Sequence, residues 1–179
     1  MAPGEREARA GLRVRAAVGG SGRPSVATGV SVLDHLLSLL AEYAAFDLSL
    51  EVEPGSASAE VAAAGRALGE ALWDPLRAPG TRGHGSATIP ADEAIAHVAI
   101  EASGRPLLVS NVDLSGAHLA GLDTDVVSAF LQELVAGAGL TLHVRLIEGA
   151  DPQHVLETIF KSLGASLAQA CRPRRREVE

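Results

Sequence analysis

Apolar and polar residues follow one another along this chain in an order that occurs twice. Each copy begins with apolar residues at three- and four-residue spacing, which predicts an amphipathic helix. It continues with apolar residues at every second position, which predicts a strand, and a turn and a second helix complete it. The predicted helix, strand and helix cover 33–44, 46–52 and 59–73 in the first copy, and 124–136, 140–146 and 153–171 in the second. Ser31 is the predicted N-cap of the first helix.

A shift of 95 positions superimposes the two copies. Leu68-Gly69 then lies over Leu163-Gly164, and Leu48 lies over His143. Identical residues are few, but the predicted elements agree along the whole overlap. Self-similarity of this kind predicts a duplicated structural unit.

The mixture of strands and helices predicts an α+β fold built by tandem duplication, each half being a sheet with helices on one face. We expect the first repeat to cover 1–90 and the second 91–179, fused into one compact unit. Further strands are predicted over 12–18, 94–102 and 106–114. A doubly wound nucleotide-binding fold is disfavoured because no glycine-rich phosphate loop joins a strand to a helix.

Composition narrows the class of protein. The net charge of −7 argues against nucleic acid as the main partner, because neutralising phosphates needs a basic face. The longest apolar stretch, 32–46, is interrupted by charged residues and is too short to span a membrane. Cys171 is the only cysteine, so no internal disulfide forms, and the N-terminus has no apolar core typical of a signal peptide. We therefore expect a cytoplasmic protein.

A basic run near the C-terminus is the exception to the acidic composition. It contains Arg172, Arg174, Arg175 and Arg176 and is followed by two glutamates. A solvated, frayed tail is the favoured interpretation, and a phosphate-binding tail is the alternative.

The second copy carries the strongest candidate for metal binding. His143 lies on the predicted strand, and His154 and Glu157 lie three residues apart on the following helix, hence on one predicted face. Imidazole and carboxylate together suit Zn, Mn or Fe. Lys161 lies one turn further on and is placed to meet a phosphate. The alternative is a solvated helix face on which Glu157 pairs with Lys161.

Three other positions carry residues with either a structural or a functional role. His35, near the start of an apolar helix, is either a hydrogen-bonded structural histidine or a ligand. Asp92-Glu93 precedes a strand and predicts either turn chemistry or substrate contact. Arg105, between glycine and proline, is either a surface residue of a turn or a bidentate phosphate ligand.

In this order the pieces resemble the imidazoleglycerol-phosphate dehydratase family of histidine biosynthesis. The resemblance spans residues 28–170. The matching segments are Thr28-Gly-Val-Ser-Val-Leu-Asp-His35, Phe46-Asp-Leu48, Ala67-Leu-Gly-Glu-Ala-Leu72, Pro90-Ala-Asp-Glu-Ala94, Ser103-Gly-Arg-Pro106, Leu122-Asp-Thr124, Gly139-Leu-Thr-Leu-His-Val-Arg145 and His154-Val-Leu-Glu-Thr-Ile-Phe-Lys161.

The resemblance implies two copies of a unit like domain 2 of ribosomal protein S5. It implies an oligomer of up to 24 subunits with sites between them, and dehydration of imidazole glycerol phosphate to imidazole acetol phosphate with Mn²⁺. It gives Glu157, Asp92 and Glu93 as candidate catalytic residues, Arg105 and Lys161 as candidate phosphate contacts, and His35, His143, His154 and Glu157 as candidate metal ligands.

The metal motifs depart from the family pattern, which is His-His-x-x-Glu in each repeat. The second repeat reads Gln153-His154 with Glu157 retained, and the first reads Ser58-Ala59 with Ala62 in place of the glutamate. Leu48 replaces the strand histidine that His143 preserves.

These departures lead to one hypothesis and two alternatives. We expect at most one divalent ion per chain and weakened or lost dehydratase activity, in a homo-oligomer that binds a small phosphate substrate. One alternative is a non-catalytic paralogue that forms a mixed oligomer with an intact dehydratase. The other is a binding module for a phosphate-bearing ligand.

Overall fold

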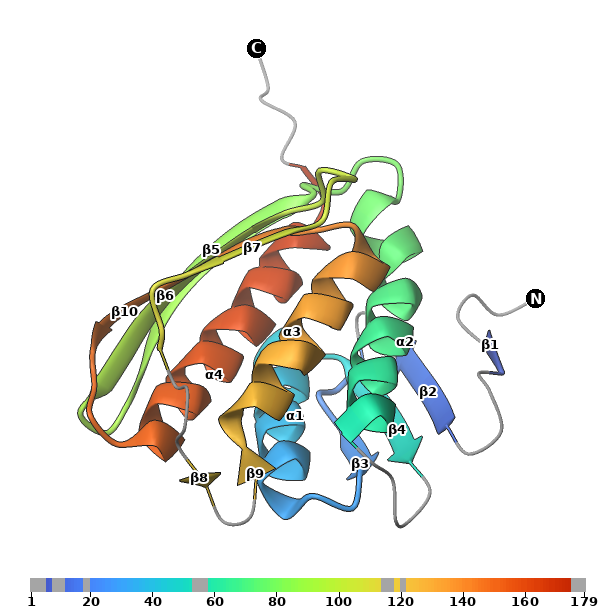
Figure 1. Ribbon diagram of the computed structural model, residues 1–179. Helices are drawn as coiled ribbons and strands as arrows, with labels where there is room; N and C mark the ends of the chain where they lie inside the picture. Colours follow the sequence, from blue (N-terminus) through green and yellow to red (C-terminus); the bar gives the residue numbers. More distant parts are fainter. Residues whose placement is uncertain are drawn as a thin grey trace.

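The part of the chain that the structure describes folds into four layers, with two four-stranded sheets outside and four helices between them (Figure 1). The computed structural model describes residues 6–7, 12–17, 20–52, 58–113, 118–119 and 122–174. The first half contains β1 (Arg6–Glu7), β2 (Leu12–Ala17), β3 (Pro24–Ala27), α1 (Ser31–Ala44), β4 (Asp47–Val52) and α2 (Ser58–Arg77). The second half contains β5 (His84–Ala91), β6 (Ala94–Glu101), β7 (Leu107–Ser110), β8 (His118–Leu119), β9 (Leu122–Asp123), α3 (Thr124–Ala138), β10 (Thr141–Glu148) and α4 (Pro152–Ala170).

The two halves have the same topology, which confirms the predicted α+β fold. The strand order is β1-β2-β4-β3 in one sheet and β5-β6-β10-β7 in the other. In both sheets the first two pairings are antiparallel and the last is parallel. The helices α1 and α2 cover the first sheet, α3 and α4 cover the second, and the helix layers pack as α1 on α4 and α2 on α3. The strand β5, which begins at His84, belongs to the second of these two sheets.

Buried positions correct the register between the two halves. A shift of 94, not 95, relates the buried residues of α1 and β4 to those of α3 and β10: Leu33, Leu36, Leu37, Leu40 and Leu48 correspond to Val127, Phe130, Leu131, Leu134 and Leu142. The shift of 95 holds for α2 and α4, where Leu68 corresponds to Leu163. The extra residue therefore lies between the strand and the second helix.

This change of one residue alters the comparison at the strand histidine. A slip of one position moves every strand side chain to the other face of its sheet. Leu48 is buried and corresponds to buried Leu142, whereas His143 is exposed. The prediction that Leu48 replaces a histidine was therefore wrong, and exposed Ser49 occupies the position equivalent to His143.

Five strands and one cap differ from the predictions. The two-residue strands β1, β8 and β9 were not predicted. β3 and β5 were not predicted either, because Pro24, Gly85 and Pro90 resemble chain breakers. β5 is an edge strand, where proline is tolerated, and a Cβ on Gly85 would overlap the carbonyl oxygen of Ser166 on α4.

The start of α1 also differs from the prediction. Val30, not Ser31, is its N-cap and makes no side-chain capping bond. Instead the Asp34 carboxylate accepts hydrogen bonds from the backbone N–H of Thr28 at 2.8 Å and from the Thr28 hydroxyl at 2.5 Å. These bonds hold the segment before the helix against its first turn. No helix in the described part of the chain is long and apolar enough to cross a membrane.

Candidate functional site

Three buried hydroxyls fix α4 against the second sheet. Thr158, Ser162 and Ser166 recur every fourth residue on the buried face of this helix. Thr158 accepts the N–H of Ala96 at 2.9 Å and donates to the carbonyl of Ile89. Ser162 accepts the N–H of Ile89 at 3.0 Å. These bonds set the height of α4 on β5 and β6, and with it the position of the polar residues at the start of α4.

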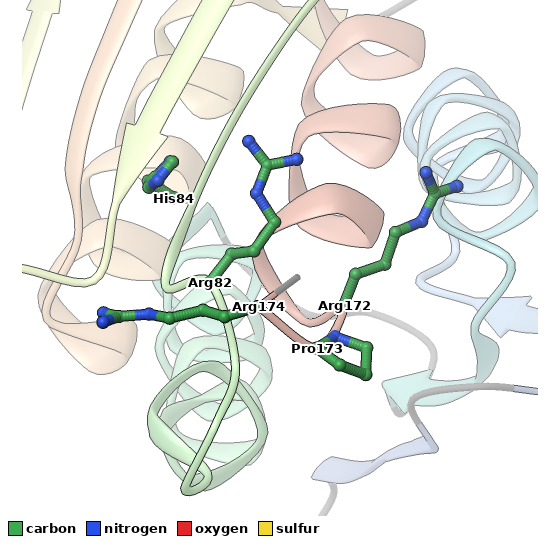
Figure 2. A pocket seen from close by; sticks show the side chains of 5 residues that line it. All are labelled: Arg82, His84, Arg172, Pro173 and Arg174. Carbon is green, nitrogen blue, oxygen red and sulfur yellow. The ribbon is translucent and has the colours of Figure 1, made fainter. Parts of the chain in front are cut away.

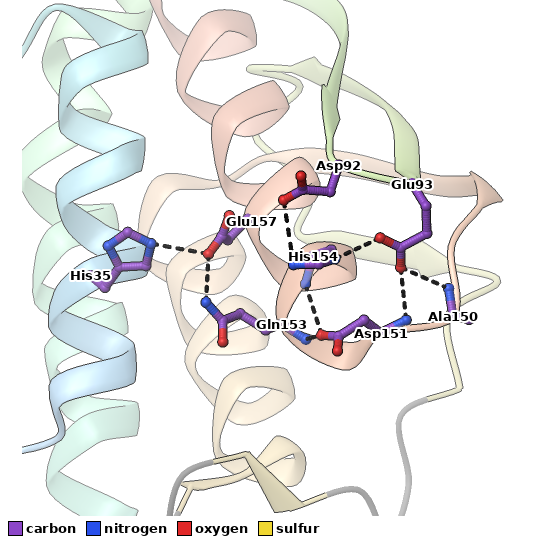
Figure 3. Close-up of polar contacts among 8 residues, drawn as sticks. All are labelled: His35, Asp92, Glu93, Ala150, Asp151, Gln153, His154 and Glu157. Carbon is purple, nitrogen blue, oxygen red and sulfur yellow. Dashed lines mark hydrogen bonds and ion pairs between the residues drawn. The ribbon is translucent and has the colours of Figure 1, made fainter.

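The first polar cluster joins the start of α4 to the turn between β5 and β6. His154 Nδ1 donates to Glu93 Oε2 at 2.6 Å, and His154 Nε2 lies 3.4 Å from Asp92 Oδ2 (Figure 3). The other oxygen of Glu93 accepts the backbone N–H groups of Ala150 and Asp151 at 3.4 and 3.0 Å. Asp92 and Glu93 form the hairpin turn between β5 and β6, where Asp92 has a φ of 48°.

The hydrogen bonds of this cluster favour its charged forms. The backbone N–H of Asp151, followed by the His154 ring, lowers the pKa of Glu93 from 4.5 to about 2. The hydrogen bond to Glu93 raises the pKa of His154 above 6.5, although partial desolvation opposes the shift. Glu93 and His154 therefore form an ion pair over a range of mildly acidic pH.

The second polar cluster joins α4 to α1. Glu157 Oε1 accepts from His35 Nε2 at 3.1 Å and from Gln153 Nε2 at 2.9 Å (Figure 3). The Glu157 side chain is 13% exposed. Burial raises the pKa of Glu157, but the bonds from Gln153 and His35 and the charges of His35 and Lys161 outweigh it, so the net pKa lies below 4.5. Within one chain, the ring of His35 is therefore hydrogen-bonded to Glu157.

The structure does not bring the predicted metal ligands of one chain together. His154 faces the β5–β6 turn, whereas Glu157 faces α1. Side chains three residues apart on a helix point in different directions, and a different element lies beside each of these two. His143 is exposed on the face of β10 opposite to buried Leu142, which faces the helices. Among the residues that the structure describes, no three or more His, Cys, Asp or Glu side chains are grouped to hold a metal ion.

The predicted phosphate contacts also lie apart. Arg105 is exposed in the turn between β6 and β7, where its N–H donates to Ser103 Oγ at 3.1 Å. Lys161 lies in the middle of α4 and forms no ion pair with Glu157, so the pair expected on a solvated helix face is absent from the described contacts. The sequence did not predict that Gln153 bonds Glu157 or that Thr158 bonds the second sheet. The available signals were the four-residue spacing of Gln153 from Glu157 and the four-residue spacing of Thr158 from Ser162.

The fold and the site together define a duplicated α+β protein with histidine–carboxylate pairs at the start of its last helix. The model of the imidazoleglycerol-phosphate dehydratase family matches residues 28–167. This chain belongs to the imidazoleglycerol-phosphate dehydratase family.

Relatives and solved structures agree with this membership. The chain is 41% identical over 162 residues to the imidazoleglycerol-phosphate dehydratase of Lactococcus lactis subsp. cremoris (strain SK11), covering 84% of this chain and 79% of that protein. It is 36% identical over 166 residues to the dehydratase of Pelobacter propionicus, covering 90% and 85%.

The crystal structure of the Staphylococcus aureus dehydratase superimposes on this chain with a TM-score of 0.85 at 29% identity, over 93% of this chain and 96% of that one. The Pyrococcus furiosus dehydratase, solved in complex with (S)-C348, superimposes with a TM-score of 0.82 at 26% identity, over 96% of each chain.

Proposed function

We propose that this chain is a dehydratase-family subunit of histidine biosynthesis whose own turnover of imidazole glycerol phosphate is weakened or lost. The observation that carries the proposal is the motif of the first repeat. Positions 58, 59 and 62 at the start of α2 correspond to Gln153, His154 and Glu157 at the start of α4, and they hold serine, alanine and alanine.

These substitutions remove the donor atoms that a transition metal needs. Imidazole nitrogen and carboxylate oxygen bind Mn²⁺ and Zn²⁺, whereas alanine offers no donor and a neutral serine hydroxyl is a poor one. Electrostatic stabilisation of developing charge is usually the largest catalytic contribution, and deleting one such group costs about a hundredfold or more in rate. The loss of a whole ligand set therefore supports a large loss of activity.

The family resemblance implies a site with two Mn²⁺ ions, which the residues of one chain do not fit. We expect at most one divalent ion per chain, Mn²⁺ by family membership, held weakly by His143, His154 and Glu157 with His35 from another subunit. Binding it would compete with the contacts His154–Glu93 and Glu157–His35, which already satisfy these side chains. The candidate catalytic carboxylates Glu93 and Glu157 are engaged in these contacts, and Asp92 Oδ2 lies 3.4 Å from His154 Nε2. Arg105 and Lys161 remain as candidate phosphate contacts.

A second candidate is a non-catalytic paralogue in a mixed oligomer with an intact dehydratase. The observation in its favour is the asymmetry of the two repeats, since His154 and Glu157 are kept in the second while the first has lost every ligand of its motif. Such a chain keeps its packing and can assemble, either with an intact partner or as a cytoplasmic homo-oligomer of up to 24 subunits.

The deciding experiment is complementation of a histidine auxotroph that lacks its dehydratase. We expect no growth with this chain alone and growth with an intact family member as the positive control. Growth with this chain alone, abolished by His154→Ala but retained by the matched variant His97→Ala, would contradict the proposal. Co-expression of the chain with an intact partner, followed by affinity purification of either one, tests the mixed oligomer.

Metal content gives an independent measurement. Elemental analysis of the purified chain after dialysis is expected to find one Mn²⁺ or fewer per chain. Two tightly retained ions per chain would show that ligands other than those of the family motif complete the site.

A further inference from the structure

The same tetrapeptide forms a turn in each repeat of the chain. Ser21-Gly22-Arg23-Pro24 leads into β3, and Ser103-Gly104-Arg105-Pro106 leads into β7. β3 and β7 are the edge strands that pair in parallel with β4 and β10. Gly22 and Gly104 have φ values of 74° and 76°, a left-handed conformation that favours glycine. The turn is thus duplicated together with the rest of the fold.

In the first repeat, a carboxylate of the chain itself occupies this turn. Asp47 is the first residue of β4, and its Oδ1 accepts the N–H of Ser21 at 2.9 Å, the hydroxyl of Ser21 at 3.2 Å and the N–H of Arg23 at 3.2 Å. Arg23 Nε donates to the Ser21 hydroxyl at 2.6 Å, which holds its positive charge beside the carboxylate. Backbone N–H groups converging in a turn, a hydroxyl and a guanidinium are the donors from which proteins build sites for oxyanions.

The turn is shaped around the Asp47 carboxylate. A Cβ on Gly20 would lie 2.3 Å from Asp47 Cγ, so only glycine leaves room for the carboxylate there. The backbone N–H groups of Arg23 and Ser21 are the main reason that the pKa of Asp47 lies below its usual 3.8, because hydrogen bonds to a charged form favour that form. The donors of the turn therefore favour a negative charge at this place.

The second-repeat turn contains no carboxylate. Thr141, the first residue of β10, corresponds to Asp47 by the shift of 94, and its hydroxyl is 2.8 Å from the Ser103 hydroxyl. The residue before the serine is Ala102, where the first repeat has glycine. Only the backbone of Arg105 forms hydrogen bonds with the described residues. One copy of the turn is therefore filled by an internal anion, and the other is not.

A separate group of arginines also lacks an internal carboxylate. It surrounds a basic pocket of about 850 Å³ at the end of α4, lined by Arg82, His84, Arg172, Pro173 and Arg174 (Figure 2). These arginines form no ion pair with the described residues. Thr81 and Pro173 form a β-bridge there, so the solvated-tail interpretation of the C-terminal basic run was wrong as far as Arg174; residues 175–179 lie outside the described part of the chain. Asp47 thus distinguishes the first-repeat turn from this pocket as well.

We propose that the first-repeat turn is a site for a small carboxylate that the chain keeps closed with its own Asp47. Removal of the Asp47 side chain opens the site to a carboxylate from solution. The contact is autoinhibitory, because it leaves the chain with one open copy of the turn, at Arg105, although the duplication supplies two. Two halves of the same fold thereby become unequal in binding. Asp47 and Arg23 lie outside the two polar clusters, so the inference does not depend on the proposed function.

The test is chemical rescue of the full chain by formate, the smallest carboxylate, with the melting temperature as the readout. Asp47→Ala empties the turn and should lower the melting temperature in sodium chloride by roughly 2–4 °C. Exchange of chloride for formate at equal ionic strength should restore most of this loss, because a ligand that binds the folded state stabilises it by mass action. Anion sites elsewhere respond equally in every variant, so the gain is measured relative to the unchanged chain.

Three further variants separate an emptied site from a lost charge. Glu51→Ala removes an exposed carboxylate from the same face of β4, opposite Arg13, and should gain no more from formate than the unchanged chain does. Asp47→Asn keeps an oxygen in the turn, so formate should not rescue it. Asp47→Thr copies the second-repeat turn and should gain from formate as Asp47→Ala does, which keeps the test decisive if the alanine variant does not fold.

Two results would overturn the inference. The first is the absence of a formate-specific gain in both Asp47→Ala and Asp47→Thr. The second is an equal gain in Glu51→Ala or Asp47→Asn, because formate would then compensate for a lost charge and not fill an emptied site. Neither result bears on complementation of the auxotroph, so the two proposals fail separately.

Discussion

His154 Nδ1 lies 2.6 Å from Glu93 Oε2 and joins the first turn of α4 to the hairpin between β5 and β6. The two residues are 61 positions apart in the sequence. A side chain that the family resemblance gives as a metal ligand is thus already bonded to a carboxylate within its own chain. The same holds for Glu157, which is bonded to His35 of α1.

The His154–Glu93 pair predicts a stability difference that depends on pH. The folded-state pKa of His154 is raised above 6.5, so its contribution is complete below pH 6.5 and is lost as the pH rises through the raised value. The pKa of Glu93 is lowered from 4.5 to about 2, so its contribution is complete above pH 4.5 and is lost as the pH falls towards 2. The melting temperature of His154→Ala, measured in EDTA, should therefore fall furthest below that of the unchanged chain between pH 4.5 and 6.5.

The matched control for that measurement is His143→Ala. The side chain of His143 is exposed and forms no hydrogen bond or ion pair with the described residues. Its replacement should change the melting temperature little at any pH in the series. A His154→Ala difference that stays constant from pH 4.5 to pH 9 would show that the ion pair contributes nothing.

Thr158→Val should destabilise the chain by about 1–3 kcal/mol, measured as the free energy of unfolding in urea. Valine keeps the shape of threonine, but the buried N–H of Ala96 and the carbonyl of Ile89 lose their partner. Thr88→Val is the matched control, because Thr88 is exposed and bonds only the ring of His97 at 2.8 Å. Its cost should stay within about 0.5 kcal/mol. Equal costs for the two variants would show that the buried hydroxyl does not fix α4.

Gly139→Ala should cost more stability than Gly80→Ala. Both glycines have positive φ, 59° and 84°, so alanine is strained by about 1–2 kcal/mol at either position. A Cβ at Gly80 meets open space, whereas at Gly139 it would overlap the ring of Trp73, over which Arg77 stacks at 3.6 Å. The difference between the two free energies of unfolding measures this close approach. If the two costs are equal, Trp73 moves aside freely.

Restoring the first-repeat motif should restore metal binding. The triple variant Ser58→His, Ala59→His, Ala62→Glu rebuilds the family pattern at the start of α2. We expect at least one more Mn²⁺ per chain than in the unchanged protein, by elemental analysis after dialysis. The control places glutamine at all three positions, which adds similar bulk without the ligands. A restored variant that binds no additional ion would locate the defect outside this motif.

The sequence by itself determined the elements that depend on local periodicity. Apolar spacing predicted α1, α3 and α4 to within a few residues and the central strands β4, β6 and β10, because the buried face of an amphipathic element repeats with its own geometry. The duplication was visible for the same reason, since both halves bury the same stripe of leucine, valine and phenylalanine. The loss of the metal ligands at Ser58 and Ala62 in the first repeat was also visible in the sequence alone.

Tertiary structure alone decided which residues meet. The edge strand β5 carries glycine and proline and is stabilised by hydrogen bonds that its own backbone N–H groups donate to the side chains of Ser162 and Gln169 on α4, which no local pattern reports. Because of a single extra residue between strand and helix in the second repeat, Ser49, and not Leu48, is the first-repeat residue equivalent to His143. A slip of one position matters because the side chains of a strand alternate between its two faces. The pairs His35–Glu157 and His154–Glu93 join residues 122 and 61 positions apart, and their geometry depends on how helices rest on sheets. Periodicity determines which face of a helix is buried, but the partner of each polar side chain is set by the neighbouring element that packing brings alongside it.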